Sequence, residues 1–350
     1  MSASRPRAFS HRFCGGLTLA AILMLVVPSC SPTAGLPPSF VPETPVVRSS
    51  PGGFALSPLP LDRPDSPLTE AAAGLLFIAD FGGGEAQQSV AEAMLGWKRS
   101  GHRVDAVVTA GDNVYPRGQE SSFDAQLRRP YSPLEVPMIA AVGNHDFQTK
   151  KGRPILRYLG QPDPPSAHRF GPVEVLVLDS NEVNEGQALW LDRSLAESQA
   201  AVRIVVFHHP AFSCGPHGST KSVQQRWLPI LSKHRVELVV SGHDHNYQKI
   251  LLPLDTRSAE AGPTPDTVDG RDHTTFIVTG GGGRELAGAK GDCKLGPARP
   301  LRFEPRHEFV SVEASESGLW VLRAVTIGGA VIDTWWGTSN RSESPRFQRS

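Results

Sequence analysis

The sequence predicts an α/β protein in which two mixed β-sheets pack together and helices cover both outer faces. After Ala72, short apolar or β-branched runs alternate with stretches of helical periodicity, which is the pattern of α/β layers. Toward the carboxyl terminus the apolar runs follow one another directly, joined by tight turns such as residues 316–318, which indicates antiparallel strands. Nearly every strand predicted before residue 241 ends in polar residues, which indicates a site at the carboxyl edge of a sheet.

Each element follows from its local pattern. The strands expected from β-branched and apolar runs cover residues 75–79, 106–110, 138–142, 173–178, 203–207 and 238–240. Helical spacing of apolar residues predicts helices over residues 87–98, 187–197 and 222–234. The antiparallel strands of the last part are expected at residues 275–279, 309–314, 319–326 and 331–335.

Composition excludes several classes of protein. Lysine plus arginine equals aspartate plus glutamate, at 35 each, so the whole chain offers no electrostatic footprint for nucleic acid or an anionic membrane. With 39% hydrophobic and 20% charged residues, the chain is neither disordered throughout nor a multi-span membrane protein. We expect one globular body over residues 72–336, which works as a monomer.

The amino terminus predicts export. Basic residues up to Arg12 precede an apolar run over residues 15–27, which is the order of a signal peptide, and we place that signal at residues 1–30. The end of the run resembles a bacterial lipoprotein box, with Cys30 as the lipidated residue that would anchor the protein to a membrane. The alternative is ordinary signal cleavage nearby. The protein is then expected in the bacterial periplasm or cell envelope as a lipoprotein, or otherwise secreted.

Two further segments look non-globular. Residues 31–71 are rich in proline and predict an extended linker, and residues 337–350 predict a disordered tail. Within the body, Cys214 and Cys293 are the two cysteines. In an oxidising compartment they can form an intramolecular disulfide. Two free buried thiols remain an alternative, and zinc ligation is less favoured because no CxxC pattern accompanies them.

The polar residues after the strands form a set of metal donors. They are Asp80, Asp112, Tyr115, Asn144, His208, His243 and His245. These hard or borderline donors, without thiolate, suit iron, zinc or manganese. Seven donors are too many for one catalytic ion with an open position, but they fit two ions that share a bridging carboxylate. Such a pair can turn water into hydroxide and clamp the oxygens of a phosphoryl group.

Five short blocks carry a family resemblance. They read Asp80-Phe81-Gly82, Gly111-Asp112-Asn113-Val114-Tyr115, Gly143-Asn144-His145-Asp146, Val205-Val206-Phe207-His208 and Gly242-His243-Asp244-His245. In order and spacing they resemble the signature blocks of calcineurin-like metallophosphoesterases, whose fold is an αββα sandwich. Most members open with Asp-x-His, whereas Gly82 has no side chain to donate and Tyr115 fills the deficit. The chain therefore looks most like the small purple, tartrate-resistant type acid phosphatases.

The resemblance also implies roles for individual residues. Asp80, Tyr115 and His245 would hold Fe(III), and Asp112 would bridge to a second ion. That ion would be Fe(II), zinc or manganese, held by Asn144, His208 and His243. His145 and His217 would aid protonation of the leaving group, with Asp146 orienting His145. His209 is interpreted as a supporting or merely buried residue, and Asp244 as turned away from the metals.

These residues predict a phosphate monoester hydrolase in which a metal-bound hydroxide attacks phosphorus. One alternative is a phosphodiesterase of the same fold, because the blocks do not distinguish the two ester classes. A less favoured alternative is a non-catalytic, lipid-anchored binding protein. A serine hydrolase is disfavoured because no Gly-x-Ser-x-Gly occurs, and the glycines at 280–283 lack the lysine of a P-loop, so they predict a flexible turn beside the cleft. Substrate choice is assigned to the loops 116–137 and 211–221.

Overall fold

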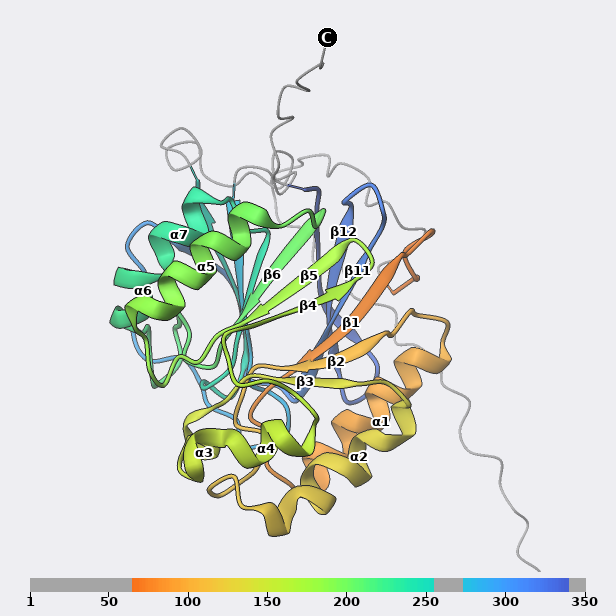
Figure 1. The fold of residues 1–350 in the computed structure, drawn as a ribbon. Coiled ribbons are helices and arrows are strands. Elements are labelled where there is room, and N and C mark those ends of the chain that lie inside the picture. Colours follow the sequence, from red (N-terminus) through yellow and green to blue (C-terminus); the bar gives the residue numbers. More distant parts are fainter. Residues whose placement is uncertain (1–64, 255–272, 340–350) are drawn as a thin grey trace, which may run out of the picture. The chain divides into compact units, whose positions relative to one another are not determined.

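The computed structural model describes residues 65–254 and 273–339 (Figure 1). The expected signal with Cys30, the linker up to residue 64, and residues 340–350 of the expected tail lie outside the described residues. The first strand begins at Ala73 and the last ends at Gly337, so Gly337 belongs to a strand rather than to the tail. Among the described helices, none combines the length and apolar character that a membrane crossing requires.

One sheet has six strands. They are β1 (Ala73–Ile78), β2 (Ala106–Thr109), β3 (Met138–Ala140), β11 (Glu308–Ala314), β12 (Trp320–Thr326) and β13 (Val331–Gly337). Their spatial order is β13-β12-β11-β1-β2-β3. The neighbours β1, β2 and β3 run parallel, whereas β11, β12 and β13 pair antiparallel. The sheet is therefore mixed, and its antiparallel part contains three of the four strands predicted from the directly successive apolar runs. The fourth, expected at residues 275–279, lies in the other sheet and runs parallel to one of its neighbours.

The second sheet has seven strands. They are β4 (Ser166–Phe170), β5 (Val173–Val177), β6 (Val202–Val206), β7 (Leu238–Ser241), β8 (Tyr247–Pro253), β9 (His273–Thr279) and β10 (Arg299–Glu304). Their order is β10-β8-β9-β7-β6-β5-β4, with β5, β6, β7 and β9 parallel. The strands β4, β8 and β10 were not expected. Sequence periodicity missed β4 because it is a half-exposed edge strand, and β8 because it buries polar residues such as Gln248.

Short helical segments complete the fold. They are α1 (Glu85–Arg99), η1 (Glu120–Ser122), η2 (Asp124–Arg128), α2 (Arg129–Tyr131), η3 (Ser132–Leu134), α3 (Asn144–Phe147), η4 (Lys150–Gly152), α4 (Arg153–Tyr158), α5 (Glu185–Glu197), α6 (Lys221–Arg226) and α7 (Leu228–Lys233). The single helix expected over 222–234 is thus two helices that meet at Trp227. Pro229 explains the break, because it has no N–H and its ring clashes with the preceding turn.

Three apolar layers hold these elements together. In β1, Leu75 and Phe77 face the core between the sheets, whereas Leu76 and Ile78 face α1 on the outside. On the second sheet, Phe207, which follows β6, packs with Trp227 in the layer beneath α5, α6 and α7. Figure 1 shows α1 and α2 on one outer face and α5, α6 and α7 on the other. The alternation of side chains along each strand thus produces the predicted layers of helix, sheet, sheet and helix.

The last residues of the expected linker are bound to the body through a buried ionic cluster. Glu313 accepts hydrogen bonds from the backbone of Leu68 at 3.0 Å and from Arg323 at 2.8 Å, and it lies 3.2 Å from a ring nitrogen of His102. Arg323 also donates to the carbonyl of Ser66 at 2.5 Å. The side chains of Glu313 and Arg323 are fully buried, so each carries the charge that the other needs.

Replacing Arg323 by methionine should lower the free energy of unfolding by about 3–5 kcal/mol, because Glu313 would keep a buried charge without its guanidinium partner. Urea unfolding followed by tryptophan fluorescence measures this change. Lys151→Met is the matched control, because its ion pair with Glu182 is about half exposed and should contribute less than about 1 kcal/mol. Equal losses in the two variants would contradict the prediction.

Candidate metal centre

The predicted donors come together where the carboxyl ends of strands from both sheets meet. Asp80 and Asp112 follow β1 and β2 of the first sheet, and His208 follows β6 of the second. One oxygen or nitrogen of each of these three side chains lies within 4.8 Å of the other two, and all three side chains are buried. Residues up to 128 positions apart in the chain therefore share one site.

Asp112 lies at the centre of the cluster. Its Oδ2 accepts the hydroxyl hydrogen of Tyr115 at 2.8 Å, and its Oδ1 accepts the backbone N–H of His145 at 2.8 Å. Its Oδ1 is also 3.5 Å from Nε2 of His208. One carboxylate thus contacts Tyr115 on one side and a histidine of the other sheet on the other, as a bridging ligand must.

The second carboxylate joins the remaining donors. Oδ1 of Asp80 lies 3.4 Å from the hydroxyl of Tyr115 and 3.7 Å from Nε2 of His245. Its Oδ2 accepts the backbone N–H of His243 at 2.8 Å. Asp80 therefore connects the tyrosine with the turn that carries both histidines.

The hydrogen bonds of His208 leave lone pairs facing one another. Its Nδ1 lies 2.9 Å from the carbonyl oxygen of Ala110, which can only accept, so Nδ1 carries the hydrogen. In the neutral ring Nε2 is then an acceptor. The Oδ1 of Asn144 lies 3.0 Å from it and Nδ1 of His243 lies 3.2 Å from it. A carbonyl oxygen and an imidazole lone pair at this distance repel each other unless a cation lies between them, so the donor set fits a metal ion.

The electrostatics of the site support this interpretation. Burial raises the pKa of Asp80 well above its ordinary value, and the nearby charge of Asp112 raises it further. Burial also lowers the pKa of His243 to about 2 and lowers that of His208, so both rings are neutral. The pKa of the Tyr115 hydroxyl is raised by burial and by the carboxylates of Asp80 and Asp112. An added cation would favour the anionic forms of Asp80 and Tyr115 here.

The backbone at these residues is strained. Asp80, Asp112 and His243 have φ values of 55°, 51° and 72°, in the left-handed region that residues other than glycine rarely adopt. Such conformations cost about 1–3 kcal/mol each and persist where the surrounding structure imposes them, which is common at functional sites. Gly143 permits the close approach of the loops, because a Cβ at this position would lie 2.0 Å from Oδ1 of Asp112.

The ring of Tyr115 fills the space that a side chain at position 82 would need. A Cβ at Gly82 would lie 2.2 Å from Cδ2 of the Tyr115 ring, and the φ of Gly82 is +44°. The backbone of Tyr115 is held by Gln126, whose side chain accepts the N–H of Tyr115 at 2.8 Å and donates to its carbonyl at 3.0 Å. The guanidinium of Arg284 covers the face of the ring at 4.5 Å. The tyrosine thus takes the place of a side chain at position 82.

The expected acid–base histidines both border the cluster. The ring of His145 lies 4.2 Å from that of Tyr115, and its Nε2 is 3.8 Å from Oδ2 of Asp112. The ring of His217 lies 4.2 Å from that of His243. Both histidines are partly or fully exposed, so a substrate can reach them.

Asp146 does not orient His145, contrary to expectation. Its carboxylate is buried and accepts the backbone N–H groups of Asn113, Val114 and Gly143 at 2.9–3.1 Å. The partner of His145 is the carbonyl oxygen of Pro116, 2.7 Å from Nδ1. The correction has a simple reason: the carboxylate closes the α3 turn onto the loop after β2, which a sequence position next to His145 does not reveal.

His209 and the glycine segment stand close to the site. Nδ1 of His209 lies 2.9 Å from the Ser180 hydroxyl, and one ring nitrogen of His209 lies within 4.8 Å of ring nitrogens of His208 and His243. The glycines at 280–283 form a turn bonded to β1, with the N–H of residue 282 donating to the carbonyl of Ala79 at 3.1 Å. Arg284 directly follows this turn, and the sequence analysis missed it, as it missed Gln126.

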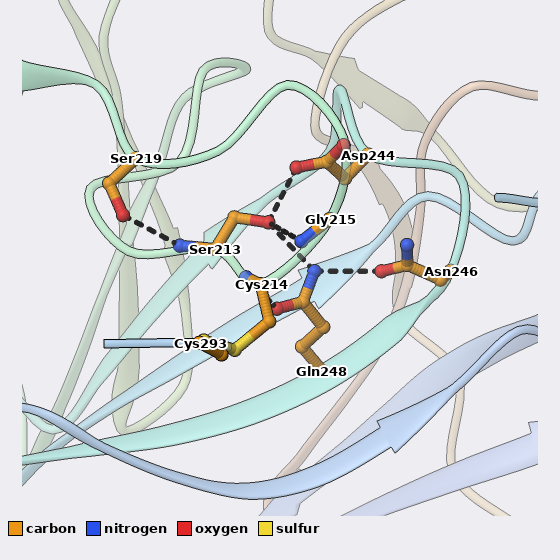
Figure 2. The surroundings of a disulfide bond; sticks show 8 residues. All are labelled: Ser213, Cys214, Gly215, Ser219, Asp244, Asn246, Gln248 and Cys293. Carbon is orange, nitrogen blue, oxygen red and sulfur yellow. Dashed lines mark hydrogen bonds between the residues drawn. A yellow bond between two sulfur atoms is a disulfide. The ribbon is translucent and has the colours of Figure 1, made fainter. Parts of the chain in front are cut away.

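Cys214 and Cys293 form a disulfide across 79 residues (Figure 2). This confirms the pairing that the sequence left open and removes the alternatives of free thiols and of zinc ligation. The bridge joins the loop that contains His217 to the segment that follows Arg284. Two chain segments that border the cluster are thereby covalently linked.

The comparisons with known proteins agree with this fold and cluster. Residues 74–247 match the family profile described as calcineurin-like phosphoesterase, and the chain belongs to this family. The chain is similar to purple acid phosphatase 3 of Arabidopsis thaliana, with 26% identity over 310 residues that cover 76% of this chain and 78% of that protein. It is accordingly a phosphoric ester hydrolase.

Two further similarities extend the comparison. Tartrate-resistant acid phosphatase type 5 of Oryctolagus cuniculus is 27% identical over 180 residues, which cover 41% of this chain and 55% of that protein, so the match spans about half of its length. The structure of the purple acid phosphatase PPD1 from yellow lupin (Lupinus luteus) seeds shares the fold, with a TM-score of 0.62 and 17% identity. The match covers 78% of this chain and 55% of the lupin protein chain.

Proposed function

We propose that this protein hydrolyses phosphate monoesters with two metal ions held around Asp112. The observation that carries the proposal is the position of the Asp112 carboxylate, in contact with Tyr115 and near His208. A lone cation would leave part of the converging donor set unused, whereas two cations sharing one carboxylate use all of it.

The donors divide into two groups around this carboxylate. Asp80, Tyr115 and His245 lie on one side, and their mutual contacts of 3.4 and 3.7 Å suit the Fe(III) site. On the other side, Asn144 and His243 meet His208 at 3.0 and 3.2 Å and would hold Fe(II), zinc or manganese. A phenolate is a hard anionic donor that favours Fe(III), which is why we assign the trivalent ion to the tyrosine side.

The ions, when bound, would supply a nucleophile from water and neutralise the charge of the phosphoryl oxygens. The chain contributes the proton for the departing oxygen. Because Nδ1 of His145 donates to the carbonyl of Pro116, its Nε2 can carry a second hydrogen on the side of Asp112, where the leaving group would lie. His217, beside His243, is the second candidate donor.

The preference for monoesters rests on similarity to proteins named acid phosphatases. It can be tested with purified protein loaded with iron and zinc. 4-Nitrophenyl phosphate should be hydrolysed at least about tenfold faster than bis(4-nitrophenyl) phosphate, because a dianionic phosphoryl group neutralises two cations better than a monoanionic one. The reverse order of rates would favour the phosphodiesterase alternative.

Asp112→Asn should lower the hydrolysis of 4-nitrophenyl phosphate by about 10³-fold or more and reduce the bound metal, because the bridging charge is lost. Metal content is measured by inductively coupled plasma mass spectrometry alongside the rate. Asp192→Asn is the matched control, because Asp192 pairs with Lys233 on the surface, away from the cluster. Full activity in Asp112→Asn would refute the proposed function.

Tyr115→Phe should bleach the visible absorption of the oxidised, iron-loaded protein, because charge transfer from a phenolate to Fe(III) requires the phenol oxygen. Tyr158→Phe, at an exposed tyrosine, should keep the colour and serves as control. A colourless wild-type protein that is active without iron would show that zinc or manganese occupies the tyrosine side instead.

We propose further that the protein is exported and anchored through a lipid on Cys30. The disulfide supports an oxidising compartment. Cells supplied with labelled palmitate should incorporate the label into the wild-type protein but not into Cys30→Ser. Equal labelling of both proteins, or of neither, would speak for ordinary signal cleavage.

A further inference from the structure

Asp244 lies between the two histidines of the last block, and its carboxylate binds the loop that carries His217. Its side chain is fully buried, and Figure 2 shows its carboxylate directed toward Ser213 and Gly215. Its Oδ1 accepts the backbone N–H of His217 at 2.9 Å, and its Oδ2 accepts the hydroxyl of Ser213 at 2.5 Å. One carboxylate therefore fixes the loop that carries His217 to the turn that carries His243 and His245.

The same loop is bonded a second time through Gln248 at the start of β8 (Figure 2). Oε1 of Gln248 accepts the N–H of Cys214 at 2.7 Å, and its Nε2 donates to the hydroxyl oxygen of Ser213 at 2.8 Å. The packing leaves no space for a side chain at Gly215, because a Cβ there would lie 2.3 Å from Cγ of Asp244. The loop is therefore packed closely against the Asp244 side chain.

The disulfide fixes the loop from the opposite side. Cys293 is covalently bound to Cys214, and the N–H of Lys290 donates to the carbonyl of Cys214 at 2.9 Å. The side chain of Lys290 donates to the carbonyl of Pro216 at 3.4 Å. Residues 213–216 are therefore held between the β7–β8 turn and segment 290–293.

His217 depends on this support because its own side chain is exposed. Glycines lie at positions 215 and 218, the latter with a φ of +76°, and Pro216 is the one residue between them that restricts the local backbone strongly. Among residues 65–254 and 273–339, no hydrogen bond to the imidazole ring of His217 is observed. Its distance from His243 is set instead by the backbone on which it stands.

We propose that Asp244 and the Cys214–Cys293 disulfide are positioning residues, which together place the His217 imidazole where it can donate a proton to the leaving group. The proposal rests on the proposed function of His217. A proton donor of this kind contributes about 10²–10⁴-fold to a rate, and a displacement of about 1 Å can remove about 10²-fold. The loss should therefore depend on how much the leaving group needs a proton.

The test uses two substrates with the metal-loaded, full-length protein. Phenyl phosphate has a basic leaving group that needs a proton, whereas 2,4-dinitrophenyl phosphate has one that leaves unprotonated. In Cys214→Ser/Cys293→Ser and in Ser213→Ala, kcat/KM for phenyl phosphate should fall about 10- to 100-fold, and that for 2,4-dinitrophenyl phosphate less than about threefold. Bound metal should stay at the wild-type amount.

Two comparisons make the result specific. His217→Ala should show the same dependence on the leaving group. Adding His217→Ala to the disulfide variant should cause no further loss of kcat/KM for phenyl phosphate, because both changes remove the same contribution, proton donation by His217. Ser222→Ala, at an exposed serine on α6 outside the network, should match the wild type on both substrates. Asp244→Asn, whose amide group can no longer accept from both Ser213 and His217, should follow Ser213→Ala.

Several outcomes would overturn the proposal. An equal loss on both substrates with metals retained would mean that the network does not act through proton donation. Unchanged rates in the disulfide and Ser213 variants would mean that the network does not position His217. Loss of metal from both variants would mean that the network holds the metal ligands instead. A wild-type protein that hydrolyses neither substrate would instead refute the proposed function itself, so the two failures are distinguishable.

Discussion

Burial and the neighbouring Asp112 carboxylate raise the pKa of Asp80, so a cation near the site is needed to favour its charged form. Between residues 65–254 and 273–339, only histidines come within ion-pair distance of these two side chains. Burial lowers the pKa of His208 and of His245, so these rings supply lone pairs rather than positive charge. The backbone N–H groups of His145 and His243 donate to the two carboxylates, so it is the surrounding side chains that require a cation once Tyr115 has lost its proton.

The packing of the two sheets stabilises the strained backbone of the site residues. Three site residues have left-handed backbone conformations, which would relax in an isolated peptide. Here the strands β1, β2, β6 and β7, which lead into the site, are buried along their whole length. Because close-packed strands hardly yield, the turns that follow them keep the unfavourable geometry. The ionic cluster around Glu313 lies on β11 and β12, in the sheet that also contains β1 and β2.

Sequence reasoning predicted which residues converge here because their signal is local: polar residues follow β-branched runs in a constant phase, and the blocks keep a known order. It also predicted two layered sheets. It failed where a residue's partner comes from elsewhere in the fold. Asp146 binds the loop after β2 rather than His145, and Gln126 holds Tyr115 from within a segment expected to be a plain loop. Asp244 was expected to turn away from the metals, but its binding of His217 depends on a contact across 27 residues that the sequence does not reveal.

The glycine at position 82 and the tyrosine at position 115 depend on each other and form a single structural feature. The Tyr115 ring fills the volume that a side chain at position 82 would need, and the positive φ of Gly82 disfavours any such side chain. A histidine could be restored at position 82 only if the ring left, and the ring is fixed by Gln126 behind its backbone and by Arg284 over its face. The position of the Tyr115 ring is therefore maintained by residues outside the predicted donor set. Gly82 and Arg284 together keep the Tyr115 ring, rather than a side chain at position 82, beside the two carboxylates.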